Sequence, residues 1–277
     1  MVSFTILVDC PDEKGLIYRI TRVLYNRQLN IVENSEYVDS DTNRFFMRTE
    51  VEGVADENIL QEELEAALPS KSYIRIITAG RKKLVVLATR ENHCLGDLMV
   101  RNHFKEWNAE ICAVISNHQT LEDFVKRLGV PFHTVIAEGK SRDDHEQAMA
   151  ALIDGYKPDY VVLAKYMRIL TPAFVERYQN RIINIHHSFL PAFVGAQPYR
   201  QAYDRGVKII GATAHFVNNN LDEGPIICQS VVPVDHSQNA SDMAKAGKDI
   251  EKMVLSQALK LILEDRVMLS GNKTIIF

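Results

Sequence analysis

Two polar segments of the sequence carry side chains that could do chemistry together. In the first, a short apolar run after Arg181 passes into an amide, two imidazoles and a hydroxyl before Pro191. These groups belong to Asn184, His186, His187 and Ser188. The second segment follows another strand-like run near His215 and has Asp222 at its tip. Apolar runs that end in this way are typical of buried strands opening into loops, where ligands of α/β sheets bind.

An amide, an imidazole and a carboxylate at neighbouring strand ends suit acyl transfer from an activated amide without a covalent intermediate. The amide N–H of Asn184 can donate to an oxyanion, and a donor of this kind is typically worth about 10² to 10³ in rate. His186 can protonate or polarise the same centre. Asp222 can hold that imidazole charged and accept a proton from an attacking water or amine.

Each of these residues also has a structural interpretation. Asn184 could cap a strand end, and Asp222 could be an acid in a turn. His186 and His187 would point to opposite faces if the strand continued through them, which would place one of them in the site. His215 is expected either beside the site or in the core. No metal is expected, because no recognised ligand spacing links these residues, and no G-x-S-x-G segment supplies an obvious nucleophile.

The elements that must position these residues alternate along the chain. Almost wholly apolar strands are expected at residues 84–88, 111–115, 160–164, 182–185, 209–214 and 226–232. Helical patterns are expected at residues 96–106, 120–128, 143–154, 198–203 and about 240–264. Apolar strands that alternate with helices have both faces covered, so the sequence predicts a doubly wound, mostly parallel α/β sheet.

Residues 1–80 show a different pattern. Strand-like runs are expected at residues 3–10, 30–38, 44–51 and 72–78, and helical runs at residues 16–24 and 56–68. The resulting βαββαβ order is the split arrangement of ferredoxin-like domains. A short linker follows at about residues 79–83, so we expect two domains, 1–80 and 83–277.

Composition narrows the classes of function. With 277 residues, of which 46% are hydrophobic, the chain can bury a sizeable core. Its net charge of -4 argues against nucleic acid as the main partner. The four cysteines are scattered, which favours reduced thiols. No apolar run approaches the roughly 18 to 20 residues that span a membrane, and no leader is evident, so we expect a soluble, cytoplasmic protein without a membrane partner.

The first segment resembles the start of ACT domains, which are small regulatory modules that often bind amino acids between paired copies. Asp9–Leu16 and Asn30-Ile31 carry this resemblance, which covers roughly residues 1–80. It implies assembly into a homo-oligomer through this domain and an amino-acid effector pocket formed by Asp12, Gly15 and Asn34. The alternative is a dimerisation module without a ligand, in which Gly15 merely permits a tight turn.

Three ordered motifs, at residues 184–193, 211–217 and 221–227, resemble the folate-dependent formyltransferase fold family. The resemblance spans roughly residues 83–277 and implies a formyltransferase-like catalytic domain. It implies catalytic roles for Asn184, His186 and Asp222, surrounded by His187, Ser188 and His215. It also implies a folate pocket that uses Met167, Arg168, Ile169, Leu170, Val217 and Asn218, with the folate as substrate and no separate cofactor.

Two departures from that family affect the expected reaction. The residue after the catalytic histidine is usually proline, and here it is His187. Glycinamide ribonucleotide formyltransferases hold the phosphate of their acceptor in a turn rich in Gly and Ser. The matching segment here, Ala88–Leu95, has no glycine and contains Glu91, which would repel phosphate.

With the acceptor site missing, the resemblance implies that water replaces the amine. The expected reaction is hydrolysis of 10-formyltetrahydrofolate to formate and tetrahydrofolate, which would supply formate for purine synthesis and balance folate pools. One alternative is formyl transfer to an unusual amine acceptor. A regulator that binds folate or an amino acid at an inactive site is another. Release of formate without an added amine would separate hydrolysis from both alternatives.

Overall fold

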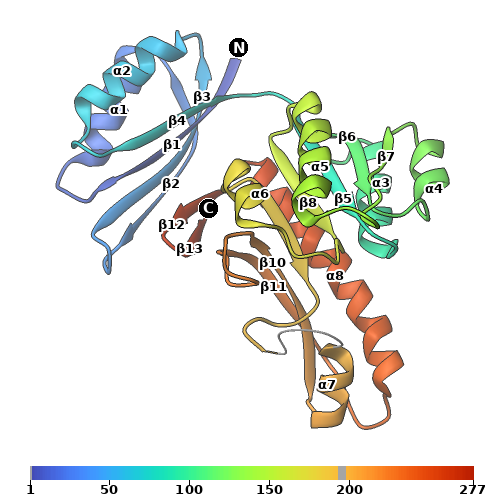
Figure 1. Cartoon of the computed structure of the whole chain (residues 1–277). Coiled ribbons are helices and arrows are strands. Elements are labelled where there is room, and N and C mark those ends of the chain that lie inside the picture. Colours follow the sequence, from blue (N-terminus) through green and yellow to red (C-terminus); the bar gives the residue numbers. More distant parts are fainter. Residues whose placement is uncertain (1, 193–197) are drawn as a thin grey trace. The chain divides into compact units, whose positions relative to one another are not determined.

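The computed structural model describes residues 2–192 and 198–277, so Phe193, the last residue of the first motif, lies outside the described residues. Contacts between residues divide the chain into two units (Figure 1). The first unit extends to Gly80 and also includes Asp265–Met268 and Ile275–Phe277. The second comprises Arg81–Glu264 and Leu269–Thr274. The chain therefore returns to the first unit at its carboxyl end, whereas the sequence placed all of residues 83–277 in the second domain.

The first unit contains the predicted βαββαβ arrangement. Its elements are β1 (Val2–Pro11), α1 (Leu16–Asn26), β2 (Asn30–Asp39), β3 (Arg44–Gly53), α2 (Glu57–Ala67) and β4 (Tyr73–Thr78). The strands pair antiparallel in the order β2-β3-β1-β4. Both helices pack on one face of this sheet, because α1 and α2 bury leucines such as Leu24 and Leu60 against alternate residues of β1, Ile6 and Val8.

The opposite face of the same sheet is covered by the end of the chain. Leu7 and Phe46 point to this face and pack with Met268, and Ile77, Ile275 and Phe277 lie against them. Two short strands supply this cover, β12 (Val267–Ser270) and β13 (Lys273–Ile276), which pair with each other. The guanidinium Nε of Arg48 donates to the carbonyl oxygen of Asp265 at 3.2 Å. The sequence did not predict these two strands, which have only four residues each.

The second unit is built on a seven-stranded sheet. Its strands are β5 (Lys82–Ala88), β6 (Ala109–Ser116), β7 (Phe132–Thr134), β8 (Tyr160–Ala164), β9 (Ile182–His186), β10 (Ile209–Phe216) and β11 (Ile226–Pro233). They lie in the order β11-β10-β9-β8-β5-β6-β7. Neighbours from β9 to β7 are parallel, whereas β10 is antiparallel to both β9 and β11. The predicted mostly parallel sheet is confirmed.

The helices of the second unit are α3 (His93–His103), α4 (Glu122–Arg127), α5 (Arg142–Tyr156), α6 (Pro172–Arg177), α7 (Pro198–Arg205) and α8 (Ala240–Leu263). Helix α3 begins three residues before the predicted start at Gly96, so this glycine lies inside the helix. The sequence missed α6 and β7, which are too short to show a period. The long helix α8 packs against β10 and β11 and contacts α3 and α7. No helix within the described ranges is long and apolar enough to cross a membrane.

Candidate active site

The end of β9 places two of the polar residues on one wall of a cavity. Asn184 and His186 are two residues apart on this strand, so their side chains point to the same face. Both line a cavity of about 330 Å³, together with residues that follow β8 and β10. The His186 ring is buried, and its Nε2 atom has no hydrogen-bond partner in the described structure. A buried ring nitrogen without a partner is costly, which suggests that a ligand supplies the partner.

Asp222 reaches the histidines by a route that the sequence did not indicate. Because β10 is antiparallel to β9, its last residue, Phe216, pairs with Ile183, near the start of β9 rather than its end. The loop after β10 therefore has to fold back along β9. A Cβ atom on Gly224 would lie 1.7 Å from the carbonyl oxygen of Phe216, so this return requires glycine. Asp222 itself has a φ of 57°, in the left-handed region.

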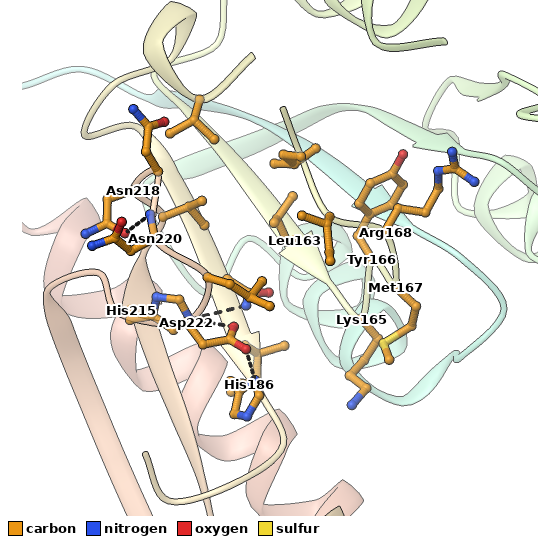
Figure 2. Close-up of a pocket in the computed structure, with 18 of the residues that line it drawn as sticks. Leu163, Lys165, Tyr166, Met167, Arg168, His186, His215, Asn218, Asn220 and Asp222 are labelled. Carbon is orange, nitrogen blue, oxygen red and sulfur yellow. Dashed lines mark hydrogen bonds and ion pairs between the residues drawn. The ribbon is translucent and has the colours of Figure 1, made fainter. Parts of the chain in front are cut away.

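Asp222 lies between two imidazoles (Figure 2). Its Oδ2 atom is 3.3 Å from Nδ1 of His186, and its Oδ1 atom is 3.7 Å from Nε2 of His215. Burial alone would raise the pKa of Asp222, but its interaction with His186 holds this pKa well below the usual range. The carboxylate is therefore ionised at neutral pH and holds the His186 ring by its Nδ1 atom.

His215 holds the amide of Asn184. The Nδ2 atom of Asn184 lies 3.2 Å from Nε2 of His215, and Nδ1 of His215 lies 2.8 Å from the carbonyl oxygen of Phe216. An amide nitrogen can only donate, so Nε2 accepts and the ring proton is on Nδ1, where it binds the carbonyl. His215 thus lies beside the expected catalytic residues and fixes the direction of one of them.

His187 and Ser188 follow the end of β9. The strand ends at His186, so the alternation that would send the two histidines to opposite faces does not apply. Their rings are instead stacked, with centroids 4.9 Å apart and an angle of 22° between the planes, and both line the cavity. The buried Ser188 hydroxyl donates to the carbonyl oxygen of Ala192 at 2.6 Å, which makes it part of the loop rather than a nucleophile.

The residues expected to bind folate line the same cavity. These are Met167, Arg168, Ile169, Leu170, Val217 and Asn218. Figure 2 shows Asp222 and His186 on one side and Tyr166, Met167 and Arg168 on the other. The side chains of Met167 and Ile169 are more than half exposed, at 59% and 55%. Large apolar side chains exposed at a cavity are suited to cover a flat aromatic ring.

A buried ionic cluster at the same cavity was missed by the sequence analysis. Glu251 of α8 is only 1% exposed, and its carboxylate contacts Nζ of Lys165 at 3.1 Å and Nε2 of His93 at 2.7 Å. It also accepts a hydrogen bond from Oη of Tyr199 at 2.6 Å. Lys165 follows β8 and lines the cavity. The available signal was helical spacing, because Glu251 lies one turn after Gly247 in α8, on the side that also buries Ile250 and Val254.

Gly247 explains how Tyr199 joins this cluster. A Cβ atom at Gly247 would lie 2.1 Å from the Tyr199 ring, so only glycine lets the ring lie across α8 and place its hydroxyl at Glu251.

His93, Cys94 and Glu251 also bring three ligand-type atoms within 4.8 Å of one another. They do not suit a metal ion, because the Lys165 ammonium already occupies the carboxylate and burial raises the pKa of the Cys94 thiol.

The residues expected to bind an effector are not adjacent within one chain. Asp12 and Gly15 both lie in the turn between β1 and α1, and Gly15 has a φ of 85°. Asn34 lies on the edge strand β2, opposite Thr49 of β3, which pairs in turn with Ile6. Its amide is bonded to Thr49 and Glu36. A pocket that includes all three residues would therefore have to form between copies of the chain.

The fold and this site define an ACT domain followed by a formyl transferase domain. The ACT domain family matches residues 4–69, and the formyl transferase family matches residues 82–259. Over 267 residues the chain is 59% identical to a formyltetrahydrofolate deformylase of Escherichia coli, with 96% of this chain and 95% of that protein covered. The chain belongs to the formyltetrahydrofolate deformylase family.

Solved structures agree with this assignment. A crystal structure of a formyltetrahydrofolate deformylase from Pseudomonas syringae pv. tomato matches with a TM-score of 0.96 and 40% identity, covering 100% of this chain and 95% of that one. A glycinamide ribonucleotide transformylase from Symbiobacterium toebii matches with a TM-score of 0.68 and 32% identity. That match covers 72% of this chain and 96% of the transformylase, so a large part of this chain has no counterpart there.

Proposed function

We propose that this protein hydrolyses 10-formyltetrahydrofolate to formate and tetrahydrofolate. The observation that carries this proposal is the cavity with Asn184, His186 and Asp222 on one side and apolar Met167 and Ile169 on the other. The first wall suits attack on an activated amide, and the second suits a pteridine ring. The names of the relatives, which are formyltetrahydrofolate deformylases, support the same reaction.

The three polar residues have separate tasks in this reaction. One N–H of the Asn184 amide is used by His215, which leaves the other to donate to the formyl oxygen as it becomes an oxyanion. His186 is oriented through Nδ1 by Asp222, so its Nε2–H can donate to the same oxygen.

Water is the acceptor in this proposal. The segment between β5 and α3 has no glycine, so it lacks the exposed backbone N–H groups of a phosphate-binding turn. The negative charge of Glu91 contributes less than the sequence suggested, because Lys248 lies 2.8 Å from its carboxylate. The side chain of His93, at the start of α3, is hydrogen-bonded to Glu251 and is therefore not available to a phosphate.

The purified protein is expected to release one formate for each 10-formyltetrahydrofolate consumed, without an added amine and in the presence of EDTA. We propose this because neither a metal nor a cofactor has a task in the reaction above. The measurement couples formate to formate dehydrogenase while the folate is followed by absorbance. Activity that disappears on chelation, or that requires an amine, would contradict the proposal.

We also propose that the ACT domain forms a homo-oligomer and binds an amino acid, glycine or methionine. Its edge strand β2 is largely exposed and could pair with another copy.

We infer that the protein supplies formate for purine synthesis. We place it in the cytoplasm, where its four free cysteines would remain reduced.

An amino-acid effector is expected to change the rate of formate release by about 5- to 150-fold, the usual range of allosteric coupling. The experiment uses the full chain, because removing residues 1–80 would expose Met268, Ile275 and Phe277. Asp12→Ala should abolish the response to glycine or methionine. Asn58→Ala changes an exposed residue on α2 and serves as the control. If neither amino acid alters the rate or the thermal unfolding temperature of the unchanged protein, the domain serves assembly alone.

A further inference from the structure

We propose that His187 is a further catalytic residue, which takes a proton from the attacking water and returns it to the folate nitrogen. This inference rests on the proposed hydrolysis, and it assigns a task that the three residues described above leave open. Water, unlike an amine, must lose a proton as it attacks a carbonyl carbon. A base with a free lone pair is therefore needed beside the formyl group.

The position of His187 suits this task. Its ring lies 4.9 Å from the ring of His186, centroid to centroid, and lines the same cavity as Asn184 and Asp222. Within the described residues, its ring contacts are with His186 and with Tyr199 at 6.4 Å, and neither ring nitrogen has a hydrogen-bond partner. A substrate water is therefore a suitable partner for one of them.

The other groups of the cavity are poorer proton acceptors. The interactions that keep the pKa of Asp222 well below its usual range make this carboxylate a weaker base than His187, whose own pKa is about 4. Nε2 of His215 already accepts a hydrogen bond from Asn184. His186, held by Asp222, is the proton donor to the formyl oxygen. Among the imidazoles of the described part of the cavity, His187 is the one whose ring nitrogens have neither a protein partner nor a task assigned above.

The surroundings of His187 favour its neutral form. Its pKa is lowered to about 4, mainly by burial and also by the positive charges of Lys165 and His186, whereas Glu251 and Asp222 act in the opposite direction. Lys165 lies at the end of β8, and its ammonium is held there by Glu251 of α8. The buried ionic cluster therefore places a fixed cation close enough to act on His187, which keeps its lone pair available at neutral pH.

The proton balance of the reaction is as follows. The water oxygen forms a bond to the formyl carbon, one water proton moves to His187, and the π electrons of the carbonyl move to the oxygen that faces Asn184 and His186. The oxyanion then reforms its double bond, and the bond between carbon and the folate nitrogen breaks. That nitrogen keeps the electron pair and takes the proton from His187. The formic acid that leaves loses its remaining proton to solvent.

The test compares two nucleophiles in the full-length protein. In His187→Asn, single-turnover formate release should fall by about 10² to 10⁴, the usual contribution of a general base. Hydroxylamine attacks through its own lone pair and does not need a proton removed first. At high hydroxylamine concentration the variant should therefore still convert 10-formyltetrahydrofolate, and formohydroxamate should exceed formate among the products.

The controls separate catalysis from folding. His133 lies on β7, outside the cavity, and its ring is hydrogen-bonded to Tyr156. His133→Asn should therefore leave both products unchanged. Thermal unfolding and a folate-binding titration show whether His187→Asn has folded, and His187→Gln replaces it if it has not. Unchanged formate release, or equal loss of formate and formohydroxamate, would overturn the role of His187. Failure of the unchanged protein to release formate would instead overturn the proposed function.

Discussion

Asp222→Asn is expected to lower kcat for formate release by about 10³ or more. The carboxylate lies 3.3 Å from Nδ1 of His186, so its loss removes both the negative charge beside this ring and the group that orients it. Asn184→Ala removes one donor to the oxyanion and is expected to cost about 10² to 10³. The double variant should lose less than the product of the two effects, because residues that act as a unit are not additive.

Single-turnover formate release, measured beside a folate-binding titration, tests this ranking. Folate affinity should change little in either variant, because the ring contacts are assigned to Met167–Leu170 and to the loop after β10. Near-normal turnover of Asp222→Asn would remove Asp222 from the catalytic residues. Weaker folate binding with unchanged turnover would assign it to substrate binding instead.

Glu251→Gln is expected to destabilise the protein by about 3 to 5 kcal/mol. The substitution leaves the Lys165 ammonium buried without the anion that compensates it, because Glu251 is its carboxylate partner at 3.1 Å. Lys165→Met combined with Glu251→Gln is the matched control. This pair removes both charges and should cost less than the sum of the single changes, because replacing a whole buried ion pair is often nearly neutral. Urea unfolding at neutral pH measures all three free energies.

The Glu251 carboxylate should also make the free energy of unfolding depend on pH in the acidic range. Burial by itself would raise the pKa of Glu251, but His93, Lys165 and Tyr199 lower it to about 2. A lowered pKa stabilises the folded state above the ordinary value of about 4.5, and this stabilisation is lost as the pH falls toward 2. The loss amounts to about 3 kcal/mol over that interval. Glu251→Gln should lack this part of the acid dependence, and an unchanged slope in the variant would contradict the assignment.

The sequence was informative wherever a local pattern decides the structure. The apolar strands, the long helix α8 and the βαββαβ order of the first unit have periods that extend over many residues. Asn184 and His186 share a face of β9 because they are two residues apart on a strand, which is also a local property. Short elements such as β7 and α6 have too few residues for a period to appear.

Features that depend on distant partners were not accessible in this way. Nothing local in residues 209–216 specifies that β10 runs antiparallel to β9, so the argument from strand ends brought Asp222 to His186 for the wrong reason. The meeting of the two residues depends on the returning loop, where Gly224 lies against Phe216. The cluster around Glu251 likewise joins side chains from three helices and from the segment after β8, and no single stretch of sequence contains its pattern.

The return of the last residues to the first unit limits how genes for such proteins can exchange parts. Recombination at a single junction after Gly80 would join a new first unit to a carboxyl-terminal segment that fits the old one. Leu7 and Phe46 of the original module pack with Met268, so a donor module with other side chains on that face would meet an ill-fitting cover. A functional chimaera therefore has to inherit both ends of the chain together.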